Sequence, residues 1–420
     1  MTFSYRIFYK IILLFLGTYC LIRATVDDIR FFPNFTFPRT HINEYSFVRT
    51  SFFATTASSA FINTEETKQI PALFGDFDLN ELAVALVKTG KPNPLRSDLQ
   101  GISLPFFTSA TYQTQAGILE AEYHIWGNPY SDIGGFSLGG SLMAQRTNAA
   151  YRFKFDAVES RLAFITPSDI ILIEKARKQA FSELNLVGDQ ASHFGFGDTT
   201  LYIRNFHNWD YTAKFRQIQA GLTAAVLIPS GLTNFSAKSH AIPTGNNGFW
   251  GVQFGADGIF QIKEFMQAGL YLKISQRFKK TKIMRAPVNN EPYVYGALIA
   301  PIKIIPGATL HLSPYFLLEE LRPDLCLGIQ YTLVHHIKDN WVDMRENKTP
   351  QTTLAQPIKF SSWAYEYLTI FGLYGRRNTS KICNDLLPEF SVKIDFPVSF
   401  FNAHHVPKTY RAVVAFSIYF

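Results

Sequence analysis

The last eleven residues, Tyr410–Phe420, constrain the fold of this chain more than any other stretch. Every second side chain there is apolar, while the positions between them include Arg411 and Ser417. Because side chains alternate between the two faces of a strand, one face is fully apolar. A soluble edge strand of this kind would aggregate, although a buried C-terminal strand of a soluble sandwich is possible. In a membrane barrel the strand pairs on both sides and its apolar face meets lipid.

This strand resembles the C-terminal signal of Gram-negative outer-membrane β-barrel proteins, an amphipathic final strand that ends in Phe. The resemblance implies an all-β fold, a transmembrane antiparallel up-and-down β-barrel in the cell outer membrane. It implies outer-membrane lipid, the barrel-assembly machinery and periplasmic chaperones as partners. The membrane-insertion signal would be carried by Tyr410, Phe416, Ile418 and Phe420.

Composition agrees with a barrel. The chain has 420 residues, of which 17% are charged, and it contains 39 Phe and 20 Tyr. The charged fraction is below the usual value of roughly a quarter. A mean hydropathy of +0.01 fits strands whose lipid-facing and lumen-facing residues average out. The alternative is a Phe-rich soluble β protein. Lys and Arg are scattered, so the net charge of +7 does not indicate a nucleic-acid partner.

The N-terminus has the pattern of a secretory signal peptide, expected over residues 1–24. Arg6 and Lys10 precede the short apolar run Ile11–Leu16, and Arg23 closes the segment. No clean cleavage site follows, so an uncleaved anchor is the alternative. Residues 25–42 are expected to form a short periplasmic segment, and residues 43–420 the barrel. No later stretch is apolar enough for a spanning helix, so membrane integration must use strands.

Alternating segments after residue 43 predict about twelve strands, and at most about fourteen. Two long insertions carry short helices, one beginning near Asp78 and one over Asp169 to about Leu184. Counting back from a periplasmic C-terminus, five longer connections fall on the outer side: Ser59–Ala110, Thr147–Asp198, Pro229–Phe249, Lys280–Gly307 and Asp339–Ile358. Long outer loops with short periplasmic turns are typical of outer-membrane barrels. The long periplasmic turn Gly375–Leu387 departs from this rule.

A second resemblance lies in the segments Gly197–Ile203 and Ala220–Gly231. Their Gly-Asp and Pro-Ser-Gly punctuation is similar to a hairpin of the aromatic-compound uptake and phenol-degradation families of outer-membrane channels. The resemblance implies a channel-like barrel.

Charged residues occupy the less apolar register of several strands, which we assign to the lumen. The lumen-lining candidates are Glu120, Glu122, Arg204, Asp257, Lys263, Lys273, Arg277, Lys393, Asp395 and Arg411. Charges that line a water-filled lumen influence which solutes can cross it. Arg204, Lys273 and Arg277 would favour anions. The alternative is a narrow or plugged lumen in which these residues pair across strands.

An enzymatic alternative rests on His311 and Ser313, which share a strand face. The outer-membrane phospholipase has a similar His-x-Ser pair, completed by an Asn on the next strand, where this chain offers Gln330. Because a complete set of catalytic groups is missing, we expect no enzyme activity. The pairs His335-His336 and His404-His405 point to opposite strand faces, so no metal or other cofactor is expected.

Cys326 and Cys383 fall on the periplasmic side and are candidates for a disulfide in an oxidising compartment. Together these features predict a porin-like outer-membrane channel for passive passage of small solutes. The insertions at 59–110 and 147–198 are expected to constrict or gate it. The alternatives are a phospholipase-like barrel hydrolase and a non-conducting surface or adhesion barrel.

Overall fold

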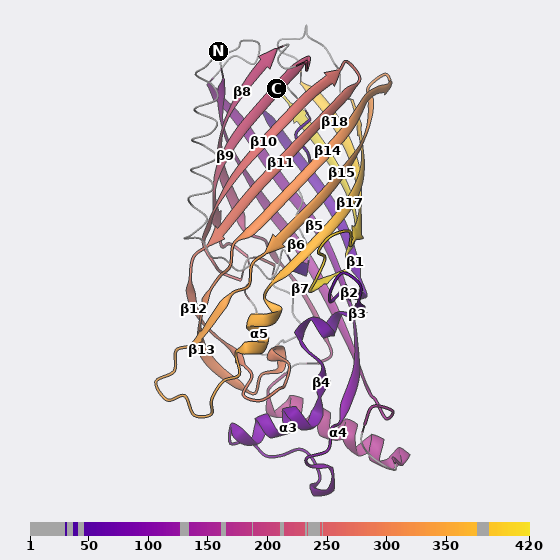
Figure 1. Ribbon diagram of the computed structural model, residues 1–420, viewed down its shortest axis with the longest axis vertical. Helices are drawn as coiled ribbons and strands as arrows, with labels where there is room; N and C mark the ends of the chain where they lie inside the picture. Colours follow the sequence, from indigo (N-terminus) through magenta and orange to yellow (C-terminus); the bar gives the residue numbers. More distant parts are fainter. Residues whose placement is uncertain are drawn as a thin grey trace.

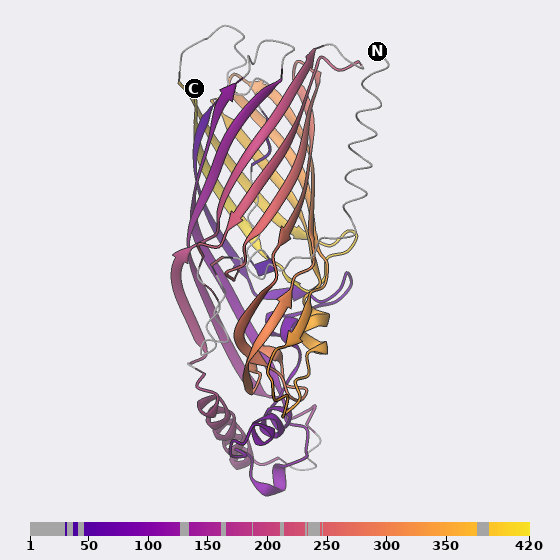
Figure 2. The same ribbon diagram turned by 90° about the vertical axis from the view of Figure 1, so that its left-hand side faces the viewer.

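The computed structural model describes residues 30–31, 37–40, 46–126, 134–160, 165–186, 188–210, 214–231, 233, 244–245, 247–375 and 386–420. Twelve antiparallel strands close into one barrel (Figures 1 and 2), which confirms the expected all-β fold class. The barrel strands, in the order in which they pair, are β1 (Phe47–Ala57), β5 (Pro105–Trp126), β6 (Gly135–Phe155), β8 (Thr199–Asp210), β9 (Gln217–Ile228), β10 (Gly251–Lys263), β11 (Met266–Arg277), β14 (Thr309–Arg322), β15 (Leu325–His336), β17 (Trp363–Tyr374), β18 (Leu387–Val398) and β20 (Tyr410–Tyr419).

The first and last strands close the barrel. Strand β20 pairs with β18 on one side and with β1 on the other, where Phe47 lies opposite Tyr419. Its side chains alternate as the sequence requires: Phe416 is 48% exposed, whereas Arg411 is 4% exposed and faces inward. Closure therefore leaves no open edge on the strand that ends the chain.

The outer surface of the barrel is apolar all the way round. Each barrel strand exposes at least one large apolar side chain: Val48, Leu119, Leu142, Leu201, Leu222, Phe254, Leu272, Leu310, Ile329, Ile370, Ile394 and Val414. Trp126 and Trp209 are exposed near the end that holds the C-terminus, and Trp250 near the opposite end. An apolar band flanked by aromatic side chains is the surface that a membrane-spanning barrel presents to lipid. Among the described residues, no helix combines the length and apolar character needed to cross a membrane.

The described parts of the five connections expected to be long lie at one end of the barrel, opposite the C-terminus (Figure 1). Together with the shorter connection between β18 and β20, which contains β19 (Val406–Pro407), they form an extension built from short strands and helices: β2 (Ser59–Phe61), β3 (Thr67–Gln69), η2 (Ile70–Phe74), β4 (Phe77–Asp78), α3 (Leu79–Lys88), η3 (Ser97–Leu99), α4 (Pro167–Glu183), β7 (Gln190–Phe196), β12 (Lys280–Ala286), η4 (Tyr293–Tyr295), β13 (Leu298–Ile305), β16 (Asn340–Asp343) and α5 (Ala355–Phe360). Strands β5 and β6 run on into it, and residues 151–155 belong to β6.

Helices α3 and α4 pack together at the tip of the extension (Figure 2). Asp78 caps α3 as expected, because its carboxylate accepts a hydrogen bond from the Asn80 N–H at 2.7 Å. Glu81 does not complete a capping box with Asp78; its carboxylate accepts a hydrogen bond from the Asn289 side chain at 2.6 Å. In α4, Ile173 is fully buried, whereas Ile170 is 38% exposed.

Four inward-facing glycines lie beneath aromatic rings of the neighbouring strand. The register pairs are Gly135 with Phe206, Gly139 with Tyr202, Gly269 with Tyr315 and Gly328 with Phe371. At Gly269 a Cβ atom would lie 2.1 Å from the Tyr315 ring. Glycine therefore lets the rings lie flat against the inner wall, which narrows the lumen without filling it.

We expect Gly269→Val to destabilise the barrel by about 1–3 kcal/mol, because the Tyr315 ring must leave its place on the wall. The temperature at which the folded band is lost in a gel mobility assay measures this. Gly117→Val is the matched control, since its Cβ would meet Phe52 on the outer face at an ordinary 3.4 Å. Equal transition temperatures for the two variants would contradict the close contact at Gly269.

Candidate functional site

Residues 37–40, which precede β1, lie inside the barrel. Before them along the chain, Arg30 and Phe31 are at the extension end, where the Phe31 ring packs on Tyr112. Ser46 is at the other end, where its carbonyl accepts a hydrogen bond from the Phe420 N–H at 2.9 Å. Residues 37–40 lie between these points and contact β1, β5, β11, β14 and β18 from within. We call residues 37–40 the inner segment.

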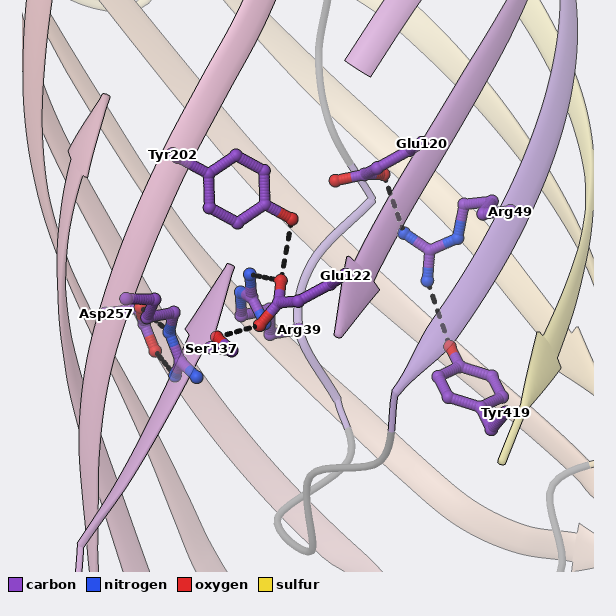
Figure 3. A network of polar contacts seen from close by, with 9 residues as sticks. Arg39, Arg49, Glu120, Glu122, Ser137, Tyr202, Asp257 and Tyr419 are labelled. Atoms are coloured by element: carbon purple, nitrogen blue, oxygen red, sulfur yellow. Dashed lines mark hydrogen bonds and ion pairs between the residues drawn. The ribbon is translucent and has the colours of Figure 1, made fainter. Parts of the chain in front are cut away.

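Arg39 ties the inner segment to the barrel wall (Figure 3). Its guanidinium donates to both carboxylate oxygens of Glu122 on β5, at 3.3 and 2.5 Å. The Glu122 carboxylate also accepts from the Ser137 and Tyr202 hydroxyls, each at 2.6 Å. Glu122 is 2% exposed and has therefore lost its hydrating water. These four hydrogen bonds compensate for that loss.

Backbone contacts hold the inner segment on the opposite wall. The carbonyl of Arg39 accepts a hydrogen bond from the Tyr315 hydroxyl on β14. The Thr40 carbonyl accepts from the Gln267 amide at 2.9 Å. The Phe37 ring lies 5.4 Å from the Arg49 guanidinium and 5.3 Å from the Lys393 ammonium. The segment therefore spans the lumen from wall to wall.

A second anchor lies at the extension end. The Arg30 guanidinium donates to the His405 carbonyl at 2.6 Å, and the Thr409 hydroxyl donates to the Phe31 carbonyl at 3.2 Å. Burial lowers the pKa of His405 to about 4. His405 is therefore neutral at pH 7, so it adds no positive charge next to Arg30.

Ion pairs join the strands along the inner wall. The pairs, with the distance between the charged nitrogen and oxygen atoms, are Arg204–Asp257 at 2.6 Å, Arg49–Glu120 at 3.5 Å, Arg277–Asp198 at 3.2 Å, Arg411–Asp395 at 2.5 Å and Lys393–Asp395 at 3.9 Å. Most of the lumen-lining candidates thus lie on the inner wall and belong to a cross-strand lattice. Lys263 is exposed at the barrel rim, with its ammonium 6.0 Å from the Phe265 ring.

The lumen holds a cavity of about 210 Å³ beside the inner segment. Its lining includes Phe37 and Arg39 of that segment and residues from eleven of the twelve barrel strands, with Lys273 among them. The insertions at 59–110 and 147–198 are the ones expected to constrict the lumen. Asp198, the last residue of the second insertion, lines the cavity. The volume is below the roughly 300–1,000 Å³ of common ligand pockets, so the space suits a small solute.

Several residues of this site were not singled out from the sequence. Arg49 lies on a strand that the alternation predicts. It shares the inward face with Ser51 and Phe53, and this register could have identified it as a lumen-lining residue. Tyr202 likewise alternates with outward-facing Leu201 and Ile203. Arg39 has no such signal, because it lies in a stretch without periodicity and was placed outside the barrel.

His311 and Ser313 face the cavity and not the outer, lipid-facing surface. The Ser313 hydroxyl donates to the Tyr331 carbonyl at 3.2 Å and lies 3.0 Å from the Thr332 hydroxyl. The Gln330 amide donates to it at 2.5 Å. These bonds tie Ser313 to β15, whereas a hydrolase acting on membrane lipid would need its nucleophile on the outer surface.

Cys326 is buried on β15, and Cys383 lies outside the described residues, so their disulfide stays a prediction. The signal peptide expected over residues 1–24 also lies outside them. The rings of His335 and His404 are 5.9 Å apart. Within the described ranges, no group of three or more His, Cys, Asp or Glu side chains is placed to hold a metal ion.

No protein-family model and no curated protein matches the sequence. Among solved structures, an outer membrane channel from Pseudomonas putida F1 is similar, with 10% identity and a TM-score of 0.48 over 91% of this chain and 97% of that one. The transport unit of the autotransporter AIDA-I from Escherichia coli has 7% identity and a TM-score of 0.39, covering 92% and 93%. A Pseudomonas aeruginosa FadL homologue has 9% identity and a TM-score of 0.31, covering 95% and 98%.

The expected resemblance to outer-membrane barrels is confirmed at the level of the fold by the closed twelve-stranded barrel itself. These TM-scores are below 0.5 and the identities are 10% or less, so the likenesses carry no argument about function.

Proposed function

We propose that this chain is an outer-membrane channel for small solutes, and that the inner segment controls the width of its lumen. The observation that carries the proposal is the cavity of about 210 Å³ inside a closed barrel, bounded partly by a polar wall and partly by residues 37–40. A barrel that served only as a membrane anchor would gain nothing from charged side chains around an internal space, because burying charge is costly. A polar lumen instead lowers the cost of passing a hydrated solute.

Passage through this lumen requires the inner segment to move or to yield on one side. It is held by side-chain contacts and by two accepting carbonyls, and it forms no strand with the wall. Such contacts can break one at a time, whereas leaving a sheet would break a whole ladder of backbone bonds. The channel is therefore proposed to exchange between a narrow and a wider state.

Currents across planar bilayers test the proposal. Purified barrel, checked for folding by its mobility shift on boiling, should give discrete current steps and should make liposomes permeable to small solutes. The same recordings are made with the Arg39→Ala variant, in which the inner segment is released. If both forms are folded and neither gives current steps, the chain is not a channel. That result would favour a non-conducting surface barrel.

A further inference from the structure

The cavity wall contains one cation whose charge is not matched by a neighbour. Arg39, Arg49 and Arg277 line the cavity, and each lies within 3.5 Å of a carboxylate. Lys273 lines the same cavity, and among the described residues its ammonium has neither an ion-pair partner nor a hydrogen-bond acceptor. A buried or half-buried ammonium without an acceptor is costly unless something else supplies the charge.

The surroundings of Lys273 leave room for a ligand. On β10 its register partner is Gly255, which has no side chain, and on β14 its partner is His311. A Cβ atom at Gly255 would make ordinary contacts of 3.4 Å or more, so this position is neither crowded nor open. The open space next to Lys273 is the cavity itself, which the Lys273 side chain lines.

The other groups around the cavity indicate which anion would fit. The Tyr271 and Ser275 side chains flank Lys273 on the same face of β11 and carry hydroxyls that can donate. Ile259, Val334 and Phe37 supply apolar surface to the same cavity. The carboxylate of Asp257, opposite Tyr271, is bound through two bonds to Arg204 and is thereby neutralised. One uncompensated positive charge with hydroxyls on one side and apolar walls on the other suits a single carboxylate on a short apolar body.

We propose that Lys273 is the anchor of a binding site for small monocarboxylates in the lumen. The site deepens the proposed function by naming a class of solute, and it rests on that function for access to the cavity. A doubly charged phosphate is a poorer ligand, because Lys273 is the one cation without a carboxylate partner among the described residues that line the cavity, and it cannot balance two negative charges.

Binding of butyrate to the detergent-solubilised full-length barrel tests the site, with saturation-transfer NMR as the readout and butyramide as the uncharged probe. The native barrel should bind butyrate at least about tenfold more tightly than butyramide, as loss of one charge-assisted bond implies. Lys273→Met should abolish that difference. Lys263→Met, which removes the exposed lysine at the rim, should leave it unchanged.

The same measurements are made with Arg39→Ala, so that a closed lumen cannot hide the site. Equal affinity for butyrate and butyramide in this open variant, or unchanged butyrate binding in Lys273→Met, would overturn the proposal. If the barrel conducts but shows no butyrate preference, the channel stands and the carboxylate site falls. If it binds butyrate at Lys273 but gives no current, the site stands and the channel falls.

Discussion

Arg39→Ala should raise the fraction of time that the reconstituted barrel spends in a wide, conducting state. The substitution removes both bonds from the inner segment to Glu122 and leaves that carboxylate with its two hydroxyl donors. A charge-assisted pair of this kind contributes about 1–2 kcal/mol when one partner is partly exposed. Arg39 is 27% exposed along its side chain, so this range applies.

A loss of about 1–2 kcal/mol changes the ratio of wide to narrow states roughly 5- to 30-fold, and single-channel recordings of open probability measure it directly. Arg216→Ala is the matched control. Arg216 also pairs with a glutamate, Glu264, at 2.5 Å, but those side chains are 45% and 76% exposed. Such a surface pair contributes little, so its loss should leave the open probability as it was. If both variants behave like the native barrel, the Arg39–Glu122 pair does not hold the narrow state.

Asp257→Ala should be the more damaging change for stability. Arg204 is fully buried, and its guanidinium donates to the two carboxylate oxygens of Asp257 at 3.0 and 2.6 Å. Without Asp257 this buried charge loses both hydrogen bonds to that carboxylate. Removing one partner of a buried pair costs about 3–5 kcal/mol.

The guanidinium has little room to find another partner. It lies over Gly221, where a Cβ atom would come within 2.5 Å of its Nη2 atom, and 5.3 Å from the Phe206 ring. Urea unfolding in detergent or lipid, followed by the gel mobility shift, measures the loss of unfolding free energy. The double variant Arg204→Met/Asp257→Leu removes both charges and should recover much of the stability, because it leaves no unpaired ion. If the double variant is as unstable as Asp257→Ala, the loss of stability comes from lost packing and not from the buried Arg204 charge.

The inward position of the charged residues could be predicted from the sequence. Glu122, Arg204, Asp257 and Asp395 each alternate with outward apolar residues, and this period of two fixes the face on which they lie. Which charge meets which is a different matter. Arg204 and Asp257 are 53 residues apart and belong to β8 and β10, which lie on either side of β9. The Arg204 side chain crosses Gly221 of β9 to reach Asp257.

The sequence by itself determined the strands, the hairpins, the end of the barrel that carries the long connections, and the lipid-facing register of the final strand. These are properties of neighbouring residues, because alternation and turn residues act over a few positions of the chain. Only the tertiary structure decided that residues 37–40 lie in the lumen, that Arg39 meets Glu122 across 83 residues, and that Lys273 has no ion-pair partner among the described residues. A closed barrel creates an interior that no single strand possesses, and what occupies that interior depends on the whole circle of strands at once.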